Sequence, residues 1–246
     1  MTVDMRSFLQ QIKKTNDLFT VKKGVSTKYE IAAVTEKLDE SKAALFENVK
    51  GSKFKLVSNL VGSRDRFAQA IGSKKSDINQ KIVKAISSAK KPRISSTAKF
   101  FENSSKDISI LPIVTHFQNE SGPFITSSIL YTRNQEKKSQ NSSFHRLMPI
   151  GKNQFSIRMV EGRDLHRSFM FAKNHGEDLP VAITIGVHPA ISIASAFQAE
   201  DGIRDCLLSR GLGDVYKRQI YKKSGKEISK LVFSQTNANR EKPILN

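Results

Sequence analysis

The sequence predicts an α+β protein in two parts, a small α/β domain followed by an antiparallel sheet. Apolar residues recur at alternating helical and strand spacing up to about Ser88, which is typical of an α/β domain. After a polar stretch at Lys90–Asp107, apolar and polar residues alternate with a period of two, which indicates a meander closing into a barrel. With 246 residues, 38% of them hydrophobic, the chain is long and apolar enough to bury a core.

The front part is expected to alternate helices and strands. Tyr29–Leu38 carries an apolar stripe at helical spacing, and Ser63 and Ser76 are each predicted to cap a helix at its N-terminus. A turn containing Gly51 separates two of the strands. The predicted helices are Ser7–Lys14, Tyr29–Leu38, Ser63–Gly72 and Ser76–Ser88, and the predicted strands are Leu18–Lys22, Ala44–Val49 and Phe54–Leu60.

The back part is expected to begin with strands of an antiparallel meander. Polar turns at Asn134–Gln140 and Gly151–Gln154 separate them. A buried strand and two helices belong to the same part, and the last helix is rich in small residues that let a backbone approach a ligand. The predicted strands are Ile108–His116, Phe124–Arg133, Ser142–Ile150, Phe155–Val160 and Val181–Val187, and the predicted helices are Asp164–Lys173 and Pro189–Phe197.

The chain is strongly basic, with a net charge of +18. Such a charge suits a nucleic-acid partner, because phosphate backbones attract clustered Lys and Arg. Here the basic residues are spread along the chain, and the tightest runs, at Lys90–Arg93 and Lys222–Lys226, lack the interleaved aromatic residues of a base-stacking surface. We therefore expect a solvated surface and no nucleic acid, and keep a basic nucleic-acid-binding or scaffold protein as the alternative.

The composition also limits the compartment. The single cysteine, Cys206, argues against a disulfide-stapled secreted fold. Charged residues in Met1–Lys14 occupy positions where a secretory signal needs an apolar run, and no stretch reaches membrane-spanning length. We expect a cytoplasmic protein with no membrane span.

One segment fits neither of its neighbours. Ala199–Gln219 reads AEDGIRDCLLSRGLGDVYKRQ and follows a clean helical pattern that ends at Gln198. The peptide DVYKRQ at Asp214–Gln219 is what GAT GTG TAT AAG AGA CAG encodes, which resembles the end of a transposon adapter used in library preparation. We predict that 199–219 is adapter-derived and leave 220–246 unassigned. The alternative is an ordinary loop with a Ser-Arg-Gly-Leu-Gly turn.

Six ordered blocks of sequence resemble the UbiD family of decarboxylases that use prenylated FMN. In the front part they are KYEIAAV (Lys28–Val34), LFENVKG (Leu45–Gly51) and NLVGSRDRFAQAIG (Asn59–Gly72). In the back part they are THFQNESGPFITSS (Thr115–Ser128), NSSFHRLMPIGKN (Asn141–Asn153) and IGVHPA (Ile185–Ala190). Several blocks in order are more specific than one short motif.

The resemblance implies a fold, an activity and cofactors. The fold would be an N-terminal α/β domain (1–106) followed by a split β-barrel of the flavin-reductase type, incomplete in this chain (107–198). The activity would be that of a carboxy-lyase acting on an unsaturated or aromatic carboxylic acid, such as anhydromevalonate phosphate or a polyprenyl hydroxybenzoate, in isoprenoid or quinone biosynthesis. Prenylated FMN would supply the chemistry, with Mn²⁺ or Mg²⁺ and K⁺ as a further candidate ion. A flavin prenyltransferase would supply the cofactor, and the full-length parent would be a homo-oligomer.

Two residues of one predicted strand carry the implied site. By the resemblance, Asn141 ligates the metal and Arg146 contacts both cofactor and substrate. Residues five apart point to opposite faces of a regular strand, so we expect a kink or bulge near Ser143 that aims both at one site. The same resemblance assigns the flavin environment to Phe144, His145, Arg146, Arg158, Met159, Val160, Arg163, Asp164 and Ser195. Without it, Phe144 and Met159 would be core residues, and Arg146 and Arg158 surface residues paired with acids.

The carboxylates of the implied site differ from the family pattern. Asp164 stands where many members have a metal-binding His, so it is either a metal ligand or the N-cap of the helix that follows; His166, two residues later, is a further candidate ligand. We expect His188 to position a turn. The family's third metal ligand, a Glu, and its EGPFGE-like catalytic motif have no counterpart in the sequence, and we do not assign Glu200 to either role. We therefore expect the chain as given to be inactive.

Overall fold

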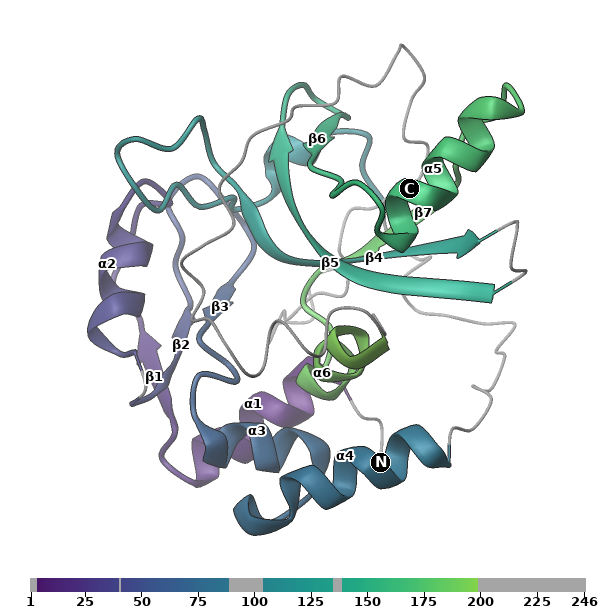
Figure 1. Ribbon diagram of the computed structural model, residues 1–246. Helices are drawn as coiled ribbons and strands as arrows, with labels where there is room; N and C mark the ends of the chain where they lie inside the picture. Colours follow the sequence, from purple (N-terminus) through teal and green to yellow (C-terminus); the bar gives the residue numbers. More distant parts are fainter. Residues whose placement is uncertain (1–3, 40, 89–103, 135–138, 199–246) are drawn as a thin grey trace. The chain divides into compact units, whose positions relative to one another are not determined.

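A computed structural model describes residues 4–39, 41–88, 104–134 and 139–198 (Figure 1). They form two units, one of residues 4–121 with 187–190 and one of residues 122–186 with 191–198. The predicted adapter segment 199–219, the tail and most of the predicted linker lie outside the described residues. Each unit is considered by itself below.

The first unit is built around a small mixed sheet. Strand β1 (Leu18–Val21) runs parallel to β2 (Ala43–Phe46), and β3 (Leu56–Ser58) pairs with β2 in the antiparallel direction. The crossover between the two parallel strands contains helix α2 (Glu30–Lys37), which makes a βαβ unit. Further helical segments of this unit include α1 (Met5–Lys14), α3 (Arg64–Ile71), η1 (Lys75–Asp77) and α4 (Ile78–Ser87).

Apolar residues at the predicted spacing form the core of this unit. Helix α1 buries Met5, Phe8, Leu9 and Ile12, which share one face of a 3.6-residue period. The Asp4 side chain accepts a hydrogen bond from the backbone N–H of Ser7 at 2.8 Å and so caps the helix. A second cluster packs α2 against β2 and consists of Val25, Ile31, Ala44, Phe46, Val49 and Val114.

The two predicted serine caps have different outcomes. Ser63 Oγ accepts a hydrogen bond from the backbone N–H of Arg66 at 3.2 Å, which confirms it as the N-cap of α3. Ser76 is not a cap, because α4 begins two residues later and its cap position is Asp77. A 3-10 turn takes up the preceding residues, and Ser76 Oγ instead lies 2.5 Å from Asp77 Oδ1.

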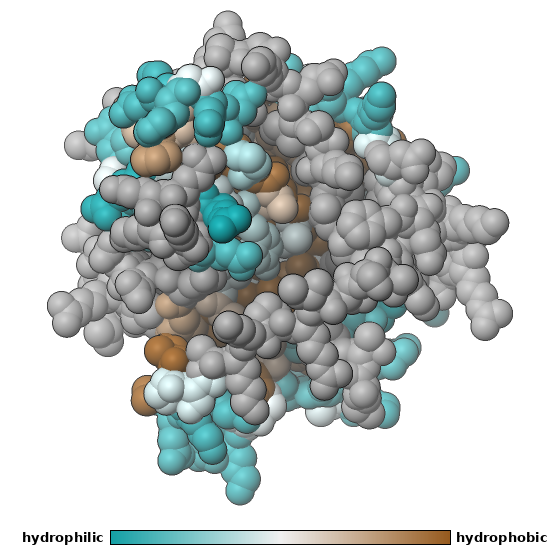
Figure 2. Space-filling model, turned by 90° about the vertical axis from the view of Figure 1, so that its right-hand side faces the viewer, coloured by the Kyte–Doolittle hydropathy of each residue, from teal (hydrophilic) through white to brown (hydrophobic). Residues whose placement is uncertain are grey.

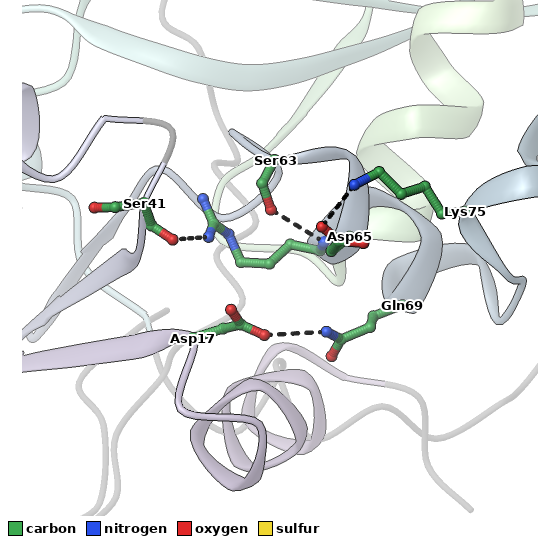
Figure 3. A network of polar contacts seen from close by, with 7 residues as sticks. Asp17, Ser41, Ser63, Asp65, Gln69 and Lys75 are labelled. Atoms are coloured by element: carbon green, nitrogen blue, oxygen red, sulfur yellow. Dashed lines mark hydrogen bonds and ion pairs between the residues drawn. The ribbon is translucent and has the colours of Figure 1, made fainter.

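A fully buried arginine connects the loops of the first unit. Arg66 donates to the carbonyl oxygens of Ser41 at 2.8 Å and of Leu60 and Asn59 at 3.3 Å. Around it, Asp17 accepts from Gln69 at 3.2 Å and Asp65 pairs with Lys75 at 3.0 Å (Figure 3). The guanidinium therefore satisfies carbonyls from the α2–β2 loop and the β3–α3 loop at once.

The second unit contains a four-stranded sheet in the order β6-β5-β4-β7. Its strands are β4 (Ile125–Asn134), β5 (Ser139–Pro149), β6 (Phe155–Ile157) and β7 (Val181–Thr184), and every neighbouring pair is antiparallel. The two long strands β4 and β5 run side by side (Figure 1). Helix α5 (Asp164–Asn174) contacts both of them, and α6 (Pro189–Gln198) follows β7.

The predicted meander is correct for its second, third and fourth strands and wrong for its first. Ile108–His116 was expected to be a strand, but it begins with a 3-10 turn, η3 (Ile108–Ile110). Its Thr115 then forms an isolated parallel bridge with Lys28 in the first unit. The remaining sheet has β6 and β7 as edges, so the described residues form an open sheet and not a closed barrel.

Apolar side chains also reach the surface of the described chain. Val83 and Ile86 of α4 are 64% and 57% exposed, and in Figure 2 apolar groups lie at the surface beside hydrophilic ones. Within the described ranges, no helix combines the length and apolar character needed to cross a membrane.

Candidate cofactor site

Strand β5 places Asn141 and Arg146 on opposite faces. Its pairing with β4 is continuous from Ser139 to His145, so side chains alternate without interruption over this range. Asn141 is buried at 8% exposure and is paired across the sheet with Thr132. The structure therefore does not bring the amide of Asn141 and the guanidinium of Arg146 to one face.

The irregularity in this ladder lies elsewhere than expected. Ile125 pairs with Leu147 and Ser128 pairs with His145, so three steps along β4 match two along β5. Two exposed residues of β4, Thr126 and Ser127, thus oppose Arg146. The expectation of a bulge near Ser143 is wrong, because the extra residue is accommodated in β4.

Arg146 lies beside an aromatic ring. Its guanidinium carbon is 4.3 Å from the ring centroid of Phe124, which is a cation–π distance. Met148, two residues along the same face of β5, packs close to Gly122, where a Cβ atom would lie 3.3 Å from the Met148 sulfur. Phe144, on this face as well, is 38% exposed. This face therefore combines a half-buried cation with apolar surface.

His145 lies on the other face, between two protein groups. Its Nε2 is 2.9 Å from Ser143 Oγ, and its Nδ1 is 3.3 Å from the carbonyl oxygen of Arg158. Because a carbonyl can only accept, Nδ1 carries the hydrogen, and neutral Nε2 accepts from the serine hydroxyl. Burial lowers the pKa of His145 below its usual 6.5, and the bond to the Arg158 carbonyl acts against that shift.

The segment after β6 holds four of the predicted flavin residues. Within it Met159 is buried and Val160 is 46% exposed, and the backbone N–H of Arg163 donates to the Val160 carbonyl at 3.2 Å. Gly162 has φ of 78°, a left-handed conformation that favours glycine, and its N–H donates to His166 Nδ1 at 3.3 Å.

Asp164 is the first residue of α5 and not its N-cap. The cap position is Arg163, which makes no side-chain capping bond. The expectation of an Asp164 cap is therefore wrong by one residue, although a carboxylate in the first turn still suits the helix dipole. Its role as a metal ligand stays a prediction.

Ser195 and His188 lie at different points of the α6 segment. Ser195 is buried at 4% exposure in the second unit, well inside the helix and away from its N-terminal amides. His188 belongs to the first unit and is also buried; its Nδ1 accepts from the backbone N–H of Ala190 at 3.1 Å. Its ring packs edge-on against Phe8 at 5.4 Å. His188 was expected to position a turn; its bond to Ala190 lies at the start of the helix.

We predict that His188 makes stability depend on pH. Burial lowers the pKa of His188 below its usual 6.5, and the negative charge of Asp4 acts in the opposite direction. The unfolded chain then binds more protons than the folded chain below about pH 6.5. The contribution of neutral His188 to the free energy of unfolding is therefore fully present above that pH, and it is lost as the pH falls through the folded pKa. Urea titrations at several pH values should show a smaller loss on acidification for His188→Asn, since Asn keeps a capping oxygen without titrating. Equal losses in both proteins would contradict the assignment.

The predicted metal ligands do not form a complete site in the described part of the chain. There, no group of three or more His, Cys, Asp or Glu side chains is arranged to hold a metal ion. Asn141 lies on β5, whereas Asp164 and the further candidate His166 lie on α5. The described residues therefore supply only candidate ligands, and the metal role of Asn141 and Asp164 stays a prediction.

Sequence reasoning missed two partners of the candidate residues. Phe124, which contacts Arg146, had no local signal, because the contact depends on the bulge in β4. Ser143 could have been found, since residues two apart on a strand share a face and can hydrogen-bond.

Family models match two adjoining stretches of the chain. Residues 9–86 match the N-terminal domain of 3-octaprenyl-4-hydroxybenzoate carboxy-lyase, and residues 88–214 match its Rift-related domain. The second match alone covers more than half of the chain. The chain belongs to the UbiD family. That match also covers 199–214, most of segment 199–219, whose adapter origin stays a prediction.

Named relatives agree with this assignment. The chain is 33% identical over 200 residues to an anhydromevalonate phosphate decarboxylase of Methanosarcina mazei and 30% identical over 193 residues to one of Methanothermobacter thermautotrophicus. These matches cover 80% and 78% of the chain but only 46% and 44% of the relatives. This UbiD-family chain thus spans about half the length of the curated relatives it matches.

Solved structures share the fold. The UbiD-class enzyme HmfF of Pelotomaculum thermopropionicum, in an evolved dimeric form with prFMN, matches with a TM-score of 0.75 and 32% identity. The match covers 79% of this chain and 46% of that one. Vanillic acid decarboxylase of Sedimentibacter hydroxybenzoicus matches with a TM-score of 0.73 at 23% identity, which supports the fold alone.

Proposed function

We propose that this chain is the front part of a prenylated-FMN-dependent carboxy-lyase. The observation that carries the proposal is the face of β5 on which Arg146, stacked on Phe124, lies beside the exposed ring of Phe144. A planar cation next to exposed apolar surface suits an anionic, unsaturated ligand and a flavin. Family membership and the similarity to an enzyme solved with prFMN support the same conclusion.

In this proposal Arg146 binds and orients the substrate carboxylate. Its guanidinium can form two parallel hydrogen bonds to a carboxylate and keeps its charge throughout. The ring of Phe124 limits the side chain to few orientations, so little ordering is needed when substrate binds. When bound, prenylated FMN would accept the electron pair released as CO₂ leaves.

The remaining roles are proposed for the residues of the resemblance. Phe144, Val160, Arg158, Met159 and Arg163 would surround the flavin in a split barrel of the flavin-reductase type, to which the described sheet would contribute one side. Ser195 would lie toward the cofactor phosphate. Asn141 and Asp164 would be two ligands of a divalent cation; because the described residues do not complete such a site, no step is assigned to a metal.

The substrate is proposed to be an unsaturated carboxylic acid that carries a phosphate. Two relatives at 30% identity or more are named as decarboxylases of anhydromevalonate phosphate, which would place the parent enzyme in isoprenoid biosynthesis. A strongly basic chain favours an anionic substrate. By analogy with the enzyme described in a dimeric form, we also propose a homo-oligomeric parent.

Cofactor binding tests the proposal. Co-expressed with a flavin prenyltransferase, the 246-residue chain is expected to purify with flavin absorbance and to bind FMN in a fluorescence titration. With Mn²⁺ added, it is expected to release no CO₂ above background, because the proposal assigns no Glu of this chain to protonating the product. A colourless chain with a salt-sensitive DNA or RNA complex would favour the nucleic-acid alternative. Turnover would contradict the proposed incompleteness of the site.

A further inference from the structure

The segment that follows β6 leaves the sheet where the candidate flavin residues begin. The β5–β6 ladder ends at the pair Leu147 and Ile157. Arg158, Met159 and Val160 come directly afterwards and belong to no strand. Backbone pairing therefore does not set their distance from β5, and side-chain contacts must contribute to it.

His145 makes such a contact. Had the ladder continued, residue 145 would have faced residue 159. Its Nδ1–H instead donates to the carbonyl of Arg158, one residue beyond the last paired position. The side chain thus continues the attachment of this segment to β5 after the backbone ladder has ended.

Both ring nitrogens of His145 are engaged within the protein. Ser143 Oγ lies at Nε2 and the Arg158 carbonyl at Nδ1, and burial favours the neutral ring that this arrangement requires. A ring held at both nitrogens has no polar atom to offer a ligand. This geometry indicates that His145 acts through its neighbours and does not bond the cofactor itself.

We infer that His145 is a positioning residue that holds the segment Arg158–Val160 against β5 in the geometry needed to bind flavin. The reference to flavin rests on the proposed function, whereas the attachment of the segment does not. Both polar atoms of the His145 side chain are bonded within the protein. Loss of the His145 side chain should therefore loosen the three residues of Arg158–Val160 without removing any of them.

The test compares two substitutions that differ in one bond. In His145→Asn the side-chain amide can occupy the position of Nδ1–H and donate to Arg158, whereas His145→Leu keeps bulk and loses the bond. His175→Leu is the matched control, because His175 also contacts a carbonyl, that of Phe171 at 2.8 Å, but at the exposed end of α5. Each 246-residue variant is measured by hydrogen–deuterium exchange over 158–162, by FMN titration and by thermal unfolding.

We expect His145→Leu to exchange amides of 158–162 about tenfold faster and to bind FMN about tenfold more weakly, the effect of one buried hydrogen bond. His145→Asn should stay within about threefold of the unsubstituted chain in amide exchange and in FMN affinity. His175→Leu should do the same, even if its melting temperature falls. If His145→Leu does not fold, His145→Gln replaces it, since its amide reaches the position of Nε2 but not that of Nδ1.

Two outcomes would overturn the inference. One is unchanged exchange over 158–162 in His145→Leu. The other is an equal change in His175→Leu, which would indicate a general loss of stability. If the unsubstituted chain binds no FMN, the proposed function fails, while the exchange measurement still decides whether His145 holds the segment.

Discussion

Replacing Arg66 with leucine is expected to destabilise the first unit by about 3–5 kcal/mol, enough to unfold it. The guanidinium is fully buried and donates to the carbonyls of Ser41, Asn59 and Leu60. A leucine would leave three acceptors without their donor in a place that water does not reach. Burial lowers the pKa of Arg66, and the charges of Asp17 and Asp65 counteract this shift and favour the cation.

Urea denaturation followed by far-UV circular dichroism measures the effect. Arg64→Leu is the matched control, two residues earlier on the same helix and exposed, and should change the free energy of unfolding by no more than about 0.5 kcal/mol. Arg66→Lys should lie between the two, because an ammonium group cannot reach three carbonyls in a planar fork. Equal stability of Arg66→Leu and Arg64→Leu would show that the network in Figure 3 contributes nothing.

Replacing Arg146 with alanine is expected to lower kcat/KM for decarboxylation by about 10²–10³-fold in an active full-length enzyme that contains residues 1–198 of this chain. Without the guanidinium, the carboxylate loses both its charge partner and its orientation. Arg146→Lys should recover part of the rate, because lysine keeps the charge but neither stacks on Phe124 in the same way nor binds a carboxylate in bidentate fashion.

Arg133→Ala provides the control for Arg146. Arg133 is an exposed arginine on β4, paired across the sheet with Gln140, and its loss should leave kcat/KM unchanged. CO₂ release under initial-rate conditions measures all three variants. If Arg146→Ala retained the full rate, Arg146 would be a packing partner of Phe124 and the proposed carboxylate site would be wrong.

Much of the local structure could be predicted from the sequence. The spacing of apolar residues located the helices of both units and the long strands β4 and β5, because 3.6-residue and two-residue periods reflect which face is buried. Ser63 was recognised as a cap from its position before a helical run. The six ordered blocks resemble the UbiD family, to which the chain belongs.

The spacing of apolar residues was less informative where apolar and polar residues alternate without forming a strand. Ile108–His116 alternates like a strand, yet it forms only isolated bridges, among them the one between Thr115 and Lys28, and no strand of the expected meander. Ser76 resembles a cap by type, but a 3-10 turn displaces the start of α4. Both errors have one cause, since the same local pattern is compatible with several partners and only long-range packing selects one.

By itself, the sequence determined the order and type of most elements and, through the family resemblance, gave the residues that are proposed for a flavin site. Only the tertiary structure decided which side of the sheet each of those residues faces and which groups it contacts. It placed the bulge in β4 opposite Arg146, turned Asn141 to the other side of the sheet and engaged both nitrogens of His145. It also buried Arg66, which composition alone would leave at the surface. Strand register and side-chain burial depend on contacts between segments far apart in the chain, and the local spacing of residues does not predict those contacts.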